Sequence, residues 1–92
     1  MTTNTVKIVK GAWDKNQKDN YQPAEVTVKE GSTMTWQNED SVVHTMTSKQ
    51  NSQFDSSMIT AGQQWQHQFK EKGNYEYYCV IHPWMQAKVN VG

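Results

Sequence analysis

Short runs in which apolar and polar residues alternate recur along this chain and constrain its fold more than any other feature. Val26 and Val28 share one side of such a run, and Met34 and Trp36 share one side of the next. Further runs of this kind cover 63–70, 74–79 and 85–92, and the shorter segment 5–10 is predicted to be a first strand. A period of two is typical of strands that bury one face, and no stretch shows the longer period of an amphipathic helix. The pattern therefore predicts a fold made of strands.

Turn-forming residues separate the predicted strands. They lie at Gly31-Ser32, Asn38 to Ser41, Ala61-Gly62 and Lys72-Gly73-Asn74. Two polar segments carry no clear pattern: residues 11–23 are predicted to be a loop, and residues 48–57 either a loop or a short frayed element. About six to eight short strands with regular turns predict an all-β sandwich or barrel. A chain of 92 residues is expected to form one domain, residues 1–92.

The composition argues against several classes of protein. Lysine supplies all nine basic side chains and balances nine acidic ones, so no basic stripe predicts a nucleic-acid partner. No apolar run approaches the roughly 18–20 residues that span a membrane. The N-terminal residues lack the apolar segment of a signal peptide. Composition leaves open both a cytosolic protein and an exported domain whose leader has been removed.

The single cysteine of the chain lies in a short segment rich in soft metal donors. Cys79 is followed by His82 and Met85, and Pro83 stiffens the intervening turn. A lone cysteine is ordinarily a buried structural thiol, but a thiolate, an imidazole and a thioether this close together favour copper, Cu(I) in particular. A trigonal blue-copper site uses one cysteine, two histidines and a weak axial ligand that is often methionine. The segment supplies all of these donors except the second histidine.

The second histidine has two candidates. His44 follows a turn-rich segment at the end of the predicted 33–38 strand, whereas His67 lies in the middle of the 63–70 run. Strand ends and loops meet at the end of a sandwich or barrel, where a metal site would lie, so we expect His44 to be the ligand. We expect His67 to be a core or edge residue whose ring is satisfied by a hydrogen bond.

Zinc binding and a catalytic thiol are the rival interpretations of the cysteine segment. Zinc sites typically contain several Cys or His residues in paired spacings, which this chain lacks, and methionine is a poor zinc ligand. Nucleophilic cysteines usually have their histidine far away in the sequence, together with a third residue that orients it. A histidine three places after the cysteine, followed by proline, suits chelation better than proton transfer.

Two segments of the chain resemble the cupredoxin family of small type 1 (blue) copper proteins, which are plastocyanin- and amicyanin-like. Cys79-x-x-His82-Pro83-x-Met85, preceded by GNYEYY, resembles the copper loop near the C-terminus of that family. The upstream block PAEVTVKEGSTMTWQNEDSVVHT resembles the family's order of strand, glycine turn, strand, asparagine-rich turn and histidine. The resemblance covers most of the chain from about Pro23 to Val91.

The resemblance implies a Greek-key β-sandwich of about seven to eight strands with one mononuclear type 1 copper at one end. Its ligands would be His44, Cys79 and His82 in the equatorial plane and Met85 in the axial position. His82 would face solvent and pass the electron. The resemblance also implies a mature domain without its leader that works in an extracytoplasmic space, either periplasmic or at the cell surface.

One position departs from the family pattern. The family often has asparagine directly after the first histidine, where it ties the two ligand loops together, and this chain has Thr45 there. We expect the Thr45 hydroxyl to substitute in part and its backbone N–H to bond the Cys79 sulfur, while Pro83 has no N–H to offer. Fewer hydrogen bonds to the sulfur would leave the thiolate electron-rich and stabilise Cu(II).

A soluble one-electron carrier is the function that these expectations favour. Redox partner proteins would dock near His82, Pro83 and Trp84, and the Trp84 ring either forms part of an apolar rim or folds back over the copper. Two alternatives remain open. One is a copper site with an open axial position that oxidises or reduces a small molecule such as nitric oxide, and the other is a copper-binding or delivery protein without a redox role. The acids Glu39, Asp40 and Asp55 are expected in solvated turns.

Overall fold

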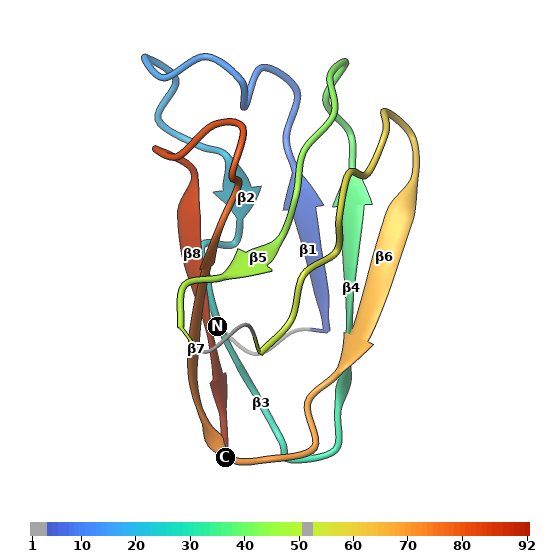
Figure 1. Cartoon of the computed structure of the whole chain (residues 1–92), viewed down its shortest axis with the longest axis vertical. Helices are drawn as coiled ribbons and strands as arrows, with labels where there is room; N and C mark the ends of the chain where they lie inside the picture. The colour runs from blue at the N-terminus through green and yellow to red at the C-terminus, as the bar shows by residue number, and fades with distance from the viewer. Residues whose placement is uncertain (1–3, 51–52) are drawn as a thin grey trace.

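The computed structural model describes residues 4–50 and 53–92, which form two β-sheets packed face to face (Figure 1). The strands in the described residues are β1 (Thr5–Ile8), β2 (Tyr21–Gln22), β3 (Glu25–Val28), β4 (Thr33–Asn38), β5 (Thr47–Ser48), β6 (Gln64–Gln68), β7 (Gly73–Tyr78) and β8 (Gln86–Val91). The all-β fold predicted from the alternation is confirmed, and of the two predicted architectures, sandwich or barrel, the structure is a sandwich. Within the described ranges, no helix has the length and apolar character needed to cross a membrane.

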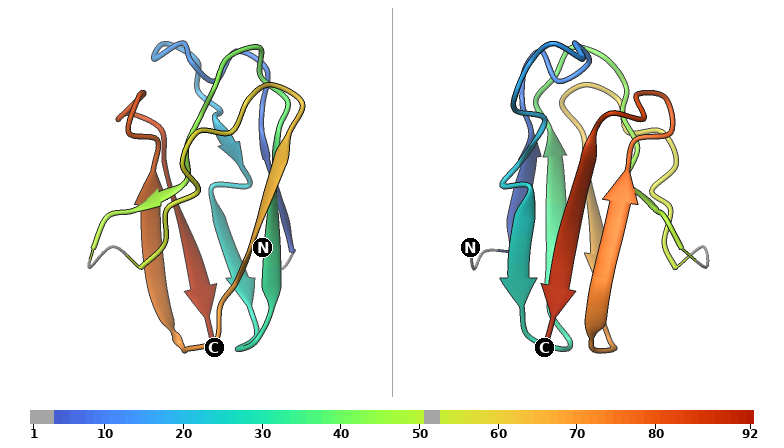
Figure 2. Two further views of the ribbon diagram at one scale, coloured as in Figure 1. Left: turned by 45° about the vertical axis from the view of Figure 1, so that its right-hand side comes forward. Right: turned by 90° about the vertical axis from the view of Figure 1, so that its left-hand side faces the viewer.

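Both sheets contain strands that are far apart in the sequence. The first sheet has the order β2-β1-β4-β6, and the second has the order β3-β8-β7-β5. β1 pairs with β4 in parallel, as β3 does with β8, whereas the β4–β6 and β7–β8 pairs are antiparallel. This connectivity brings the segments 9–20, 39–44, 60–63 and 79–85 to the same end of the sandwich (Figures 1 and 2). We call it the loop end.

The two segments without a clear pattern contain strand residues: the first contains all of β2, and the second contains one residue of β5. β2 lies within the predicted 11–23 loop, and its Tyr21 side chain is buried. β5 overlaps the start of the predicted 48–57 segment and pairs with β7. Each of these strands has only 2 residues, so the sequence contains no alternation that could reveal it. Residues 51–52 of the second segment lie outside the described residues.

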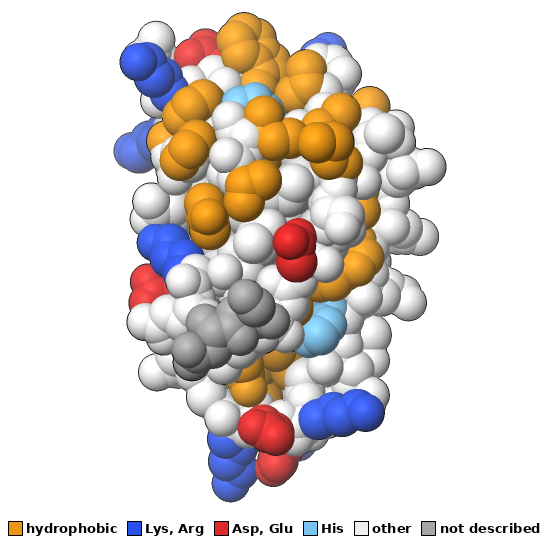
Figure 3. All heavy atoms as spheres, in the orientation of Figure 1, with side chains coloured by type: hydrophobic (Ala, Val, Ile, Leu, Met, Phe, Trp, Pro, Cys, Tyr) orange, Lys and Arg blue, Asp and Glu red, His pale blue; other side chains and the backbone are white. Residues whose placement is uncertain are grey.

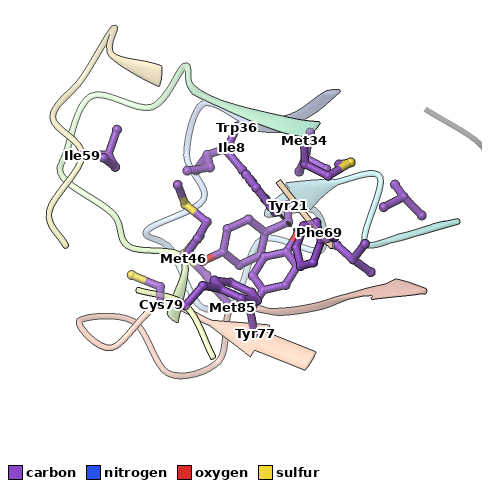
Figure 4. Packing of buried hydrophobic residues seen from close by; sticks show 14 of the residues in the cluster. Ile8, Tyr21, Met34, Trp36, Met46, Ile59, Phe69, Tyr77, Cys79 and Met85 are labelled. Atoms are coloured by element: carbon purple, nitrogen blue, oxygen red, sulfur yellow. Dashed lines mark hydrogen bonds between the residues drawn. The ribbon is translucent and has the colours of Figure 1, made fainter. Parts of the chain in front are cut away.

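The core between the sheets consists of the inward residues of the alternating runs. Trp36 of β4 is fully buried and lies opposite Trp65 of β6. The Trp36 indole N–H donates a hydrogen bond of 3.1 Å to the hydroxyl of Tyr77, which is on β7 in the other sheet (Figure 4). Burying a large apolar side chain contributes about 1.5–3 kcal/mol. β4 and β7 are therefore fixed relative to each other, and each leads directly into a segment of the loop end.

Candidate metal centre

A tight turn after β7 carries the predicted cysteine and one of the predicted histidines. Cys79 continues the inward face of β7 and is fully buried. The His82 N–H donates to the Cys79 carbonyl at 3.2 Å, and the Met85 N–H donates to the His82 carbonyl at 2.9 Å. The Cys79 N–H closes the turn on the Met85 carbonyl at 3.2 Å. As a result, Cys79 Sγ lies 3.5 Å from His82 Nδ1.

The other predicted histidine reaches the same point from the segment that follows β4. His44 is held by a short antiparallel bridge to Ile59, with backbone hydrogen bonds of 3.1 and 2.8 Å. Its Nδ1 lies 3.8 Å from Cys79 Sγ, and its ring centre lies 4.9 Å from that of His82. The donor atoms of His44, Cys79 and His82 all lie within 4.8 Å of one another, an arrangement that one metal ion can bridge.

The fourth predicted ligand, Met85, ends the turn that begins at Cys79. Its side chain is fully buried, as is that of Cys79. Figure 4 shows Cys79 at one margin of the buried hydrophobic cluster and Met34 on the opposite side of that cluster. A thioether from the 79–85 turn therefore lies in the buried cluster and not on the surface.

His67 lies apart from the cluster of donor atoms. It is on β6, half-buried, and its ring stacks on the ring of Trp65 with the centres 5.5 Å apart. The rings of Phe54 and Phe69 have their centres 5.2 and 4.8 Å away. β6 is an edge strand, which is one of the two positions predicted for His67. The hydrogen bond that we expected for this ring is not found among the described residues. Aromatic packing takes its place.

The Cys79 thiol lies in surroundings that favour its ionisation. Burial alone would raise the pKa of this thiol. Hydrogen bonds with His44, with the Thr45 N–H at 3.4 Å and with His82 outweigh burial and lower the pKa to about 6. The thiolate is the form of cysteine that binds metals. At neutral pH the sulfur is therefore largely in its metal-binding form.

Thr45 ties the two ligand segments together, as expected. Its backbone N–H donates to Cys79 Sγ at 3.4 Å. Its hydroxyl accepts a hydrogen bond of 3.0 Å from the Val80 N–H, and its carbonyl accepts one from the Tyr21 hydroxyl. The segment that carries His44 is thus joined to the segment that carries Cys79 by one residue.

The surroundings of Asp40 differ from the solvated turn that we expected, and that prediction is wrong. The Asp40 side chain is fully buried, and its Oδ2 lies 2.7 Å from His44 Nε2. Burial would lower the pKa of His44, but hydrogen bonds with Cys79 and Asp40 raise it above its ordinary value. Burial would raise the pKa of Asp40, but hydrogen bonds with His44 and with three backbone N–H groups lower it. The one sequence signal was an acid four residues before a candidate ligand.

Exposed apolar side chains lie on the loop segments at the end of the sandwich where His82 is partly exposed. We call them the apolar rim: Trp13, Val42, Val80, Ile81 and Trp84. Trp84 is 40% exposed, and its ring centre lies 5.3 Å from that of His82, so it stands beside the imidazole and leaves it partly open. Figure 3 shows hydrophobic side chains concentrated toward this end, with charged side chains at its margins and at the opposite end.

Sequence comparisons place the chain among copper proteins. Residues 7–92 match the family described as copper binding proteins, plastocyanin/azurin family. The chain is 35% identical over 79 residues to amicyanin of Paracoccus versutus, a match that covers 82% of this chain and 60% of that protein. It is 32% identical over 75 residues to amicyanin-alpha of Methylorubrum extorquens, covering 77% of this chain and 63% of that protein. The chain thus spans about three-fifths of the length of these curated relatives.

Structural comparisons extend the likeness to nearly the whole chain. A structure described as a novel purple cupredoxin from Nitrosopumilus maritimus gives a TM-score of 0.93 at 33% identity, covering 98% of this chain and 100% of that one. An oxidized mutant of amicyanin gives a TM-score of 0.79 at 29% identity, covering 96% of this chain and 80% of that one. Because both matches cover nearly all of this chain, they include the loop end, where the donor atoms cluster.

Proposed function

Because the chain belongs to the plastocyanin/azurin family of copper-binding proteins and has the cupredoxin fold, we propose that it binds one copper ion and acts as a one-electron carrier. His44 and His82 would each supply Nδ1, and Cys79 would supply Sγ. Met85 would be the axial ligand. When bound, copper supplies the change between Cu(I) and Cu(II). The observation that carries the proposal is the clustering of these three donor atoms within 4.8 Å.

The donor set fits copper by its chemistry. One thiolate and two imidazole nitrogens are the equatorial set of blue-copper sites, and a buried methionine in the same turn suits the weak axial position. The lowered pKa of Cys79, about 6, means that little free energy is needed to deprotonate the sulfur at neutral pH. Zinc sites, in contrast, rarely use a single sulfur together with a thioether.

The structure around the donor atoms suits a metal centre whose charge changes while its geometry stays nearly constant. Backbone hydrogen bonds close the turn from Cys79 to Met85, and Thr45 joins that turn to the His44 segment. Donors that are in place before the charge changes need little reorganisation when it does. A small reorganisation lowers the barrier for electron transfer, which favours a carrier.

His82 is the ligand through which the electron would enter and leave. His44 and Cys79 are fully buried, whereas His82 is partly exposed within the apolar rim. We propose that redox partner proteins dock over His82, Pro83 and Trp84 with an apolar face, and that their association depends little on salt because the rim carries no charge. We further propose an extracytoplasmic location, which is supported by the family resemblance.

A visible absorption spectrum tests the copper proposal directly. After one equivalent of Cu(II), we expect an intense thiolate-to-copper band that bleaches with ascorbate and returns on reoxidation. The absence of an intense band would contradict the type 1 assignment. A band that bleaches once and is not restored would support copper binding and contradict the carrier role.

A second candidate is redox chemistry on a small molecule at an open axial position. It is favoured by the likeness to a cupredoxin described as purple, because the colour of such sites depends on the axial contact. The full burial of Cys79 and Met85 favours the carrier. Titrating the copper-loaded protein with azide separates the two: a shift of the band indicates an accessible axial position, and an unchanged band supports the carrier.

A further inference from the structure

Asp40 is the one buried acid among the described residues, and every acceptor direction of its carboxylate is used. Oδ1 accepts the N–H of Gly11 at 2.9 Å and the N–H of Ser41 at 2.8 Å. Oδ2 accepts the N–H of Trp13 at 3.2 Å and lies 2.7 Å from His44 Nε2. A carboxylate offers about four acceptor sites, so this one is saturated by the protein without solvent.

The contact with Asp40 decides which nitrogen of His44 carries a proton. An ionised carboxylate only accepts hydrogen bonds, so Nε2 must be the protonated nitrogen. The lone pair of the neutral ring then lies on Nδ1, the atom that is 3.8 Å from Cys79 Sγ. An imidazole without such a partner exchanges between two tautomers, and only the Nε2–H tautomer leaves Nδ1 free for a metal.

The same carboxylate fixes the turn that carries Trp13. Gly11 has a φ of 86°, a backbone conformation that residues with a side chain rarely adopt, so the turn favours glycine at this position. Trp13 is 49% exposed and belongs to the apolar rim. One buried side chain thus joins a ligand of the proposed site to the surface on which a partner would dock.

We propose that Asp40 is a positioning residue that holds His44 in the tautomer with Nδ1 free for copper and anchors the Trp13 turn to the same ligand. The inference rests on the proposed function and deepens it. Partners of metal-bound histidines raise the basicity of the ligand. The negative charge of Asp40 therefore favours Cu(II) over Cu(I) and lowers the reduction potential.

Asp40→Asn tests this role, because the amide keeps the shape of the side chain and places a donor where Oδ2 was. The new N–H₂ group would face two donors, the Trp13 N–H and the His44 Nε2–H. We expect the affinity for Cu(II) to fall about 10–100-fold and the amide protons of Gly11 and Trp13 to exchange faster. If Cu(II) binding weakens tenfold more than Cu(I) binding, the potential rises by about 59 mV.

Glu39→Gln is the matched control, because it removes the same charge at the neighbouring position. The Glu39 side chain is 49% exposed and lies 3.7 Å from Lys7 Nζ. We expect its potential and its copper affinity to equal those of the wild type. Equal shifts in the Asp40→Asn and Glu39→Gln proteins would overturn the inference, since charge at the loop end would then account for both.

NMR of the metal-free wild-type protein tests the tautomer without copper and without a variant that must fold. The signals of the His44 ring nitrogens should be recorded as the pH is raised from about 6 until they stop changing. The ring is then neutral, and we expect its proton to be on Nε2. A neutral ring protonated on Nδ1 would overturn the inference even if the protein binds copper. Nε2–H in a protein that develops no copper band would instead refute the proposed function and support the His44–Asp40 pairing.

Discussion

Two regions of this sandwich each contain a largely buried histidine. Among the described residues, only the histidine at the loop end belongs to a cluster of donor atoms that could bind a metal. At the loop end, His44 has a sulfur 3.8 Å from Nδ1 and a carboxylate oxygen 2.7 Å from Nε2. On the β6 flank, His67 has aromatic rings, with the centres of Trp65 and Phe69 at 5.5 and 4.8 Å. The neighbours, and not the residue type, make one imidazole a candidate ligand and the other a packing group.

The pKa values of the two rings respond to this difference in opposite directions. Burial lowers the pKa of both rings. At His67 nothing opposes burial, so the pKa is lowered. At His44 hydrogen bonds with Cys79 and Asp40 outweigh burial, so the pKa is raised. Surroundings that raise the pKa of a histidine supply negative charge, and the same negative charge stabilises a bound metal cation.

Cys79→Ser should have the largest effect, because it removes the negative sulfur that distinguishes the loop end from the flank. We expect the intense visible band to vanish. Loss of a hydrogen-bond partner of a metal ligand can lower metal affinity roughly 100-fold, and we expect loss of the ligand itself to lower the Cu(II) affinity by more than that. The measurement is a copper titration followed by absorbance. A band of wild-type intensity would show that the sulfur is not a ligand and would remove the basis of the comparison.

Met85→Leu should have the next largest effect, on the potential and not on binding. Losing a weak axial donor that favours Cu(II) should raise the reduction potential and shift the band, while copper stays bound. Met34→Leu is the matched control, since Met34 is equally buried but lies on the other side of the core from Cys79. Both are volume-conserving changes that typically cost under about 1.5 kcal/mol. Voltammetry in which the two variants give the wild-type potential would remove Met85 from the ligand set.

Thr45→Val should have a smaller effect, confined to the tie between the ligand segments. Valine keeps the shape and the N–H that donates to Cys79 Sγ, but it loses the hydroxyl that accepts from the Val80 N–H. We expect the metal-free protein to lose about 1 kcal/mol of unfolding free energy, with little change in the copper band. Urea unfolding measures the first quantity. Wild-type stability in the variant would mean that the sandwich alone holds the two segments in place.

Much of the fold could be predicted from the sequence, because each long strand buries one face and so alternates. β2 and β5 could not, since each has only 2 residues. Cys79 and His82 could be predicted as a donor pair because the turn that joins them is local. The choice of His44 over His67 rested on a strand end, and the donor cluster contains the first and not the second.

Asp40 could not be predicted, because its burial depends on partners that are distant in the sequence. Two of the partners of its carboxylate are the backbone N–H groups of Gly11, which is 29 residues away, and of Trp13, which is 27 residues away. The parallel pairing of β1 with β4 brings that turn beside the His44 segment. An acid next to Glu39 in a polar turn carries no local sign of such a partner.

His67→Gln should have the smallest effect, because it leaves the donor cluster untouched. The copper band and the potential should equal those of the wild type, and a loss of copper would show that the wrong histidine had been assigned to the flank. The expected effect is on stability. Losing the ring contacts should lower the unfolding free energy by about 1 kcal/mol near pH 8.

The pH dependence of the difference in unfolding free energy between the wild type and His67→Gln is the most sensitive test of the comparison between the two regions. With the pKa of His67 lowered in the folded state, this residue binds more protons in the unfolded chain, so its contribution to stability falls as the pH drops below about 6.5 and levels off below the lowered pKa. Glutamine does not titrate, so the gap between the two proteins should narrow through that window. Cys79 and His44 titrate in both proteins and cancel in the difference. A gap that widens toward low pH in urea unfolding would mean that the folded flank stabilises charged His67, and the two regions would then not differ in the charge they offer.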